Sequence, residues 1–215
     1  LVNLLALQGG QLCAATLLTL TACGGDGDDS VAGPAPAPSP APGPAPVTLQ
    51  GQVTRNAALK DATVCLDLNG NDACDAGEPA SALTGEDGRY SLTALPDQAA
   101  AARLIAVVKA NVTTDASNPG QPVTTTTDYV LKRPAGSAGG INPLTTLVQA
   151  GVAAGMTEAQ ARSNAAAQLG IDAAKIDDYQ DDPPASDTQV QDTARWIAAF
   201  TSIALRDGIP LEVAD

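Results

Sequence analysis

The chain has 215 residues and carries a net charge of −13 at neutral pH, with a pI near 4.1. This acidity disfavours nucleic acid as a partner, argues against a polybasic membrane patch and makes cations the natural partners. These 215 residues include no histidine, which removes Ser-His-Asp and Cys-His catalysis, histidine-containing zinc sites and a histidine pH switch. Aromatic residues make up 2% of the chain, so a core must be built from Ala, Val, Leu and Ile.

Residues 1–23 form an apolar stretch that ends in Leu20-Thr21-Ala22-Cys23 and is too short to span a bilayer. An ordinary buried helix fits less well, because a Gly/Asp-rich segment follows at once. The stretch resembles a bacterial lipoprotein signal that ends in a lipobox. The resemblance implies export, acylation of Cys23 and anchoring to one leaflet of the lipid bilayer. Gly24 after the cysteine implies, by the sorting habit of such lipoproteins, the outer membrane of a Gram-negative cell.

Residues 24–46 form a linker, rich first in Gly and Asp and then in Pro and Ala. The Pro-rich part, residues 33–46, favours extended polyproline II, which rises ~3.1 Å per residue and can hold a domain clear of a lipid surface. We expect the signal and this linker to be disordered.

From Val47 the sequence changes to short alternating segments separated by turn residues. The pattern predicts a β-sandwich of roughly 90 residues over 47–134, in which Val64, Leu66 and Leu68 face the core and Cys65 points outward. Expected strands lie at 47–54, 62–68, 89–92, 104–109 and 124–131, and expected turns at 55–61, 85–88, 96–97 and 118–120.

The segment from Asp67 to Glu78 has the pattern of a calcium loop. Side-chain oxygens fall at loop positions 1, 3, 5, 9 and 12, and the backbone carbonyl of position 7 completes a set suited to a hard cation. The predicted ligands are Asp67, Asn69, Asn71, Ala73, Asp75 and Glu78.

The loop departs from the EF-hand form in two ways. Position 6, normally glycine, is Asp72, and the flanks read as β-strands because Pro79 blocks a following helix. The alternative is an Asn/Asp/Gly-rich β-turn whose side chains bond their own backbone.

Two cysteines flank the first part of this loop. A Cys65–Cys74 disulfide would close the loop on itself, and export makes oxidation plausible. The short ring predicts a modest entropic gain, so the bridge would mainly hold the ligand geometry. A thiol-redox role is the alternative, although the spacing is not C-x-x-C.

Three segments together, 51–54, 62–79 and 84–92, resemble the prealbumin-like (transthyretin-like) β-sandwich modules, which include carboxypeptidase regulatory-like domains and SdrD B-like repeats. The resemblance covers about residues 47–134. It implies that the D-x-N-x-N-x-x-x-D-x-x-E-P run holds calcium, here through Asp67, Asn69, Asn71, Asp75 and Glu78. Such modules are scaffolds or ligand-presenting domains without catalysis.

Residues 141–215 predict a small helical region. Asn142 is a suitable N-cap with Pro143 at the first helical position, and Thr157 is expected to cap a second helix that runs to about Leu169-Gly170. A third helix is expected over 186–206, where Trp196, Ile197, Phe200, Ile203 and Ala204 would pack in a core. The Asp-rich segment 172–187 is read as a solvated acidic loop or a second cation site.

These features favour a non-enzymatic, lipid-anchored cell-envelope protein whose calcium-stabilised module is a scaffold or adhesion module for an unknown surface protein or matrix ligand. The alternative is an accessory part of a secreted hydrolase that processes peptides or carbohydrates, since paired carboxylates can hydrolyse glycosides without histidine. The scarcity of aromatic residues argues against a stacking-type sugar site.

Overall fold

The computed structural model describes residues 43–178, 192 and 196–197. The predicted signal, most of the linker, Cys23 and most of the third expected helix lie outside these residues. The described residues belong to one compact unit, which contains the strands and the first two predicted helices. Among the described residues, no helix has the length and apolar character needed to cross a membrane.

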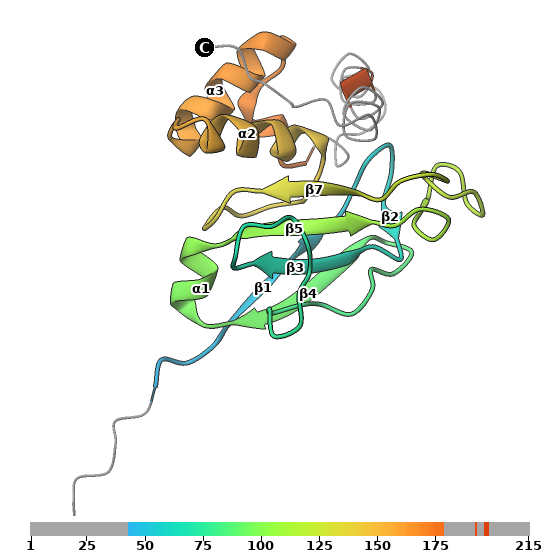
Figure 1. The fold of residues 1–215 in the computed structure, drawn as a ribbon. Coiled ribbons are helices and arrows are strands. Elements are labelled where there is room, and N and C mark those ends of the chain that lie inside the picture. Colours follow the sequence, from blue (N-terminus) through green and yellow to red (C-terminus); the bar gives the residue numbers. More distant parts are fainter. Residues whose placement is uncertain (1–42, 179–191, 193–195, 198–215) are drawn as a thin grey trace, which may run out of the picture. The chain divides into compact units, whose positions relative to one another are not determined.

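The described strands form three small antiparallel sheets (Figure 1). The first pairs β1 (Val47–Gln52) with β4 (Arg89–Ala94), and the second pairs β2 (Leu59–Lys60) with β6 (Thr114–Asp115). The third has the order β3-β5-β7, from β3 (Thr63–Asp67), β5 (Arg103–Val108) and β7 (Tyr129–Arg133). Five of the strands overlap the five expected segments, while β2 lies in a segment expected to be a turn.

The first and third sheets contribute to a single apolar core. Val64 and Leu66 of β3 and Leu92 of β4 belong to the same buried cluster, with Leu104 of β5 and Leu131 of β7. Alternation along β4 places Tyr90, Leu92 and Ala94 inward and the residues between them in solvent. The structure therefore has mixed strand and helix content, with antiparallel sheets around a mostly aliphatic core that also includes Tyr90 and Tyr129.

One expectation for β3 is wrong. Leu68 is 41% exposed and not in the core, because the strand ends at Asp67 and the chain then turns into the loop, where strand alternation no longer applies. Cys65 does lie on the opposite face from Val64 and Leu66, but it is fully buried. The segment around Ala80 pairs with β3 at Cys65, so the outer edge of this strand is covered.

Pro96-Asp97, expected to be a turn, instead begins helix α1 (Pro96–Ala101). Proline suits the first helical position because its missing N–H would have no intrahelical partner there. The Gln98 side chain accepts a hydrogen bond from the backbone N–H of Leu95, which helps to cap this short helix. Helix α1 leads directly into β5 and so fixes where Arg103 begins that strand.

The two predicted helices begin at the predicted caps. Helix α2 (Pro143–Ala153) is capped by Asn142, whose side chain accepts from the Thr145 N–H, and α3 (Glu158–Leu169) is capped by Thr157. Gly170 ends α3 in the left-handed conformation at φ 65°. A 3₁₀ turn, η1 (Ala173–Lys175), follows.

Helix α2 is attached to β7 by hydrogen bonds. The Thr146 hydroxyl accepts from the backbone N–H of Lys132, and the Thr145 hydroxyl donates to the Lys132 carbonyl. Side chains at the start of α2 thereby provide hydrogen-bond partners for the backbone N–H and C=O of Lys132 on the edge of β7. Leu144 and Val148 pack with Ala161 and Ala165 of α3 in a second small core.

Three described residues, 192, 196 and 197, fall within the third expected helix. Ile197 is partly buried against the second core, as predicted, but Trp196 is 78% exposed, so the prediction that it packs in a core is wrong. Phe200, Ile203 and Ala204 lie outside the described residues.

Candidate functional site

The candidate site is the loop that begins at the last residue of β3. The predicted Cys65–Cys74 disulfide joins β3 just before the loop to the eighth position of the loop, nine positions further along the chain, with a Cα–Cα distance of 5.7 Å. The anchor on one side is a buried strand residue and on the other a loop residue. The pairing gives the loop a covalent closure independent of any ion.

Asp67, loop position 1, is the buried anchor of the loop. Its carboxylate accepts hydrogen bonds from the backbone N–H groups of Gly70 at 2.7 Å, Asn71 at 3.1 Å and Asp72 at 3.0 Å. The Arg103 guanidinium adds two more, from Nε at 3.0 Å and Nη2 at 2.7 Å to Oδ2. The Asp67 side chain is fully shielded from solvent.

The charge state of Asp67 follows from these contacts. Burial alone would raise the pKa of this carboxyl, but the Asp72 N–H, the Arg103 guanidinium and the Gly70 N–H outweigh it and hold the pKa below its ordinary value. Asp67 is therefore ionised at neutral pH and electrostatically matched by Arg103.

Three of the predicted ligands meet at the outer part of the loop. The side-chain amides of Asn69 and Asn71 each donate to Oδ2 of Asp75 at 2.7 Å. Their own carbonyl oxygens accept from the backbone N–H groups of Asn71 and Ala73, respectively. The structure thus brings positions 3, 5 and 9 together around one carboxylate oxygen.

Glu78, loop position 12, bridges the two ends of the loop. One carboxylate oxygen accepts from the Leu68 N–H at 2.8 Å and the other from the Asp75 N–H at 3.0 Å. The Glu78 side chain therefore closes the loop by binding the backbone N–H groups of Leu68 and Asp75.

Three residues that the sequence analysis did not name as ligands, one in the loop and two from the sheet, are joined by ion pairs at the site. Asp72, the residue in place of the usual glycine, has φ 63° and binds two cations: Arg103 Nη2 at 2.8 Å and Lys132 Nζ at 2.7 Å. Arg103 lies directly opposite Asp67 in the β3–β5 register, and Lys132 lies opposite Ile105 in the β5–β7 register. A cation at the start of an apolar strand was the available signal for Arg103.

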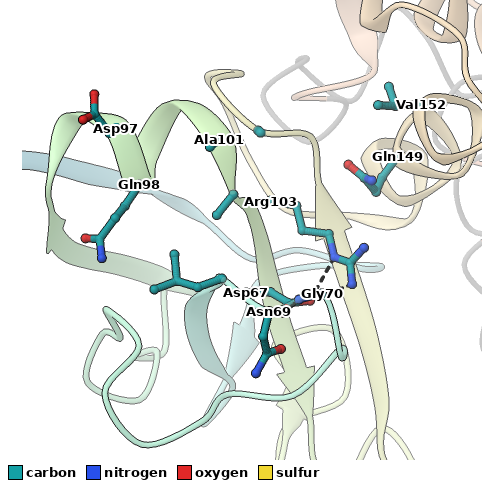
Figure 2. A pocket seen from close by; sticks show the side chains of 12 residues that line it. Asp67, Asn69, Gly70, Asp97, Gln98, Ala101, Arg103, Gln149 and Val152 are labelled. Carbon is teal, nitrogen blue, oxygen red and sulfur yellow. Dashed lines mark hydrogen bonds and ion pairs between the residues drawn. The ribbon is translucent and has the colours of Figure 1, made fainter.

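An open hollow of about 640 Å³ lies beside the start of the loop. Figure 2 shows Arg103 directed at Asp67 there, with α1 contributing Asp97, Gln98 and Ala101, and α2 contributing Gln149 and Val152. Its lining mixes small apolar side chains with amides, and the Arg103 side chain is 21% exposed. Solvent therefore reaches the Arg103 side chain but not the Asp67 carboxylate that it binds.

The donor set can be compared with the needs of calcium. Carboxylate and amide oxygens are the right type, and Asn69, Asn71, Asp75 and Glu78 are close in the fold. Asp67, in contrast, is already bound by a guanidinium. Over residues 43–178, 192 and 196–197, no group of three or more Asp, Glu or Cys side chains has the spacing of a metal cluster, so most of the oxygens would have to come from amides and backbone.

No protein-family model matches the sequence, and comparison with curated proteins and with solved structures finds no match. The functional argument accordingly depends on the residues of this chain.

Proposed function

We propose that this protein is a non-enzymatic, exported scaffold or binding module, anchored to the cell envelope through an acylated Cys23, in which a prealbumin-like β-sandwich presents a calcium-stabilised loop. The observation that carries the proposal is the convergence of Asn69, Asn71 and Asp75 in a loop closed by the Cys65–Cys74 bridge. The shared apolar core of the β1-β4 and β3-β5-β7 sheets is consistent with a sandwich.

The residues that would hold the ion are Asn69, Asn71, Asp75 and Glu78, with the Ala73 carbonyl. Bound calcium would supply positive charge and fix the outer part of the loop. Asp67 would not bind the ion but would order the first half of the loop, through its hydrogen bonds to three backbone N–H groups. Extracellular calcium modules commonly bind in the range of roughly 10⁻⁴–10⁻³ M, so we expect weak binding that suits a calcium-rich exterior.

The calcium part of the proposal is tested by titration calorimetry on the full, oxidised chain. The wild type should bind one calcium ion, and an Asp75→Ala/Glu78→Ala variant should lose at least tenfold in affinity. A Glu86→Ala/Asp87→Ala variant removes two carboxylates from an exposed turn and should bind as the wild type does. Equal binding by all three proteins would show that the ion is held elsewhere or only by diffuse charge.

The anchoring part is tested by expressing the chain in a Gram-negative host supplied with labelled fatty acid. The wild type should incorporate label and fractionate with the outer membrane, whereas a Cys23→Ala variant should do neither. Labelling that survives the substitution would contradict the lipobox assignment.

A further inference from the structure

Two cations from the β3-β5-β7 sheet reach into the loop. Arg103, the first residue of β5, binds both Asp67 and Asp72, and Lys132 of β7 binds Asp72 through its other carboxylate oxygen. The two carboxylates and two cations form a chain of three salt bridges, each between 2.7 and 2.8 Å, whose formal charges cancel.

The strand register explains why these residues meet. Asp67 and Arg103 are directly paired, and Cys65, Ile105 and Lys132 are paired along the next row of the same sheet face. The disulfide, the ion pairs and the base of the loop therefore share one side of the β3-β5-β7 sheet. The opposite side, with Leu66, Leu104 and Leu131, belongs to the apolar core.

Asp72 also has a reason to replace the usual glycine. A non-glycine residue at φ 63° is energetically disfavoured, and here that conformation accompanies a carboxylate held by two cations. Glycine would remove the conformational strain but could not bind Arg103 or Lys132.

We infer that Arg103 and Lys132 are built-in cations that keep the loop folded without a metal ion. Arg103 positions Asp67, which in turn holds the N–H groups of Gly70, Asn71 and Asp72, while Lys132 secures the far side of Asp72. The loop is thus closed by side chains of its own sheet as well as by its disulfide.

A second consequence rests on the proposed calcium function. Calcium would meet a loop already folded, so little ordering cost would oppose binding, but two nearby positive charges would weaken it. Arg103 and Lys132 would then set the calcium affinity, and removing Lys132, which binds Asp72 but not Asp67, should tighten binding severalfold.

The test is hydrogen exchange of the Gly70, Asn71 and Asp72 amides in the full, oxidised chain with chelator present. These amides should be protected in the wild type, and Arg103→Met should speed their exchange by about tenfold or more, with a smaller increase in Lys132→Met. Arg89→Met, which removes an exposed cation from β4, should leave them unchanged. Amides of β5 and β7 report whether each variant remains folded.

Unprotected amides in the wild type, or less than a twofold change in a folded Arg103→Met protein, would overturn the inference. If Arg103→Met unfolds the whole domain, the Lys132→Met variant provides the test. An unchanged exchange rate of the Asp72 amide in that variant would overturn the inference. Adding calcium separates the two proposals. If calcium alters neither protection nor any binding signal while the chelator results hold, the calcium site is wrong and the built-in cations stand.

Discussion

Two N–H groups of the Arg103 guanidinium converge on a single carboxylate oxygen of Asp67, and these residues face each other across the β3–β5 pair. The Asp67 side chain has no solvent contact, so Arg103 and three backbone N–H groups replace its hydration. This pair joins the β3-β5-β7 sheet to the candidate calcium loop, and we expect the loop to depend on it with or without an ion.

Replacing Asp67 with Ala should therefore destabilise the protein even in chelator. The change leaves the Gly70 and Asp72 N–H groups without their acceptor and removes one of the two carboxylates that bind the partly buried Arg103 guanidinium, which costs about 3 kcal/mol. Urea unfolding followed by circular dichroism measures the loss. Glu86→Ala, at an exposed carboxylate, should change little, and equal unfolding midpoints for the two variants would contradict the anchoring role.

Reduction of the Cys65–Cys74 disulfide should cost about 2–3 kcal/mol, the chain-entropy value for a ring of this size. A Cys65→Ala/Cys74→Ala variant should match the reduced wild type and be insensitive to reductant. The comparison uses urea unfolding with and without dithiothreitol. No difference between oxidised and reduced wild type would mean that the bridge does not constrain the unfolded chain.

We expect the protein to lose stability at high pH because the pKa of the buried Tyr90 hydroxyl is raised. Its ring is 4% exposed and its hydroxyl accepts from Arg133, yet burial raises its pKa above the ordinary 10.0 while the Arg133 charge opposes that shift. Because the unfolded chain ionises first, this contribution is present below pH ~10 and is lost as the pH rises through the folded-state pKa. The stability difference between wild type and Tyr90→Phe should therefore shrink from about pH 9 to pH 11. A constant difference over that range would contradict the assignment.

The Asn142 cap should matter more than the Thr157 cap. Asn142 is fully buried and, besides accepting from Thr145, donates to the carbonyls of Ile176 and Asp177. Asn142→Ala should cost about 2–3 kcal/mol, whereas Thr157→Ala at an exposed cap should cost about 1 kcal/mol. Denaturant midpoints with unchanged slopes measure both values. Equal losses would show that the contacts to Ile176 and Asp177 add nothing.

Local chemistry in the sequence predicted much of the fold. The Asn142-Pro143 and Thr157 signals determine helix starts through bonds within one turn, and alternation located five strands. The Cys65–Cys74 pairing was expected because one cysteine lies just before the loop and the other inside it. Helix α1 was missed because proline before aspartate fits a turn as well as a first helical turn.

The missed parts of the site depend on contacts far apart in sequence. Arg103 and Lys132 lie 36 and 60 positions from their loop partners, and only the strand register brings them there. Leu68 was expected in the core because strand alternation was extended past Asp67, where β3 ends, and Trp196 was expected in a core beside an apolar helical stripe but is exposed. Long-range pairing cannot be read from a single periodic pattern.

The most direct test of the central claim is a thermal melt of the full, oxidised chain with excess calcium and with chelator, for the wild type, Asp75→Ala/Glu78→Ala and the control Glu86→Ala/Asp87→Ala. Calcium at a hundredfold its dissociation constant should add ~2.7 kcal/mol, several degrees in the midpoint, to the wild type and the control but not to the loop variant. Identical midpoints with millimolar calcium and with chelator in all three proteins would contradict a calcium-stabilised loop.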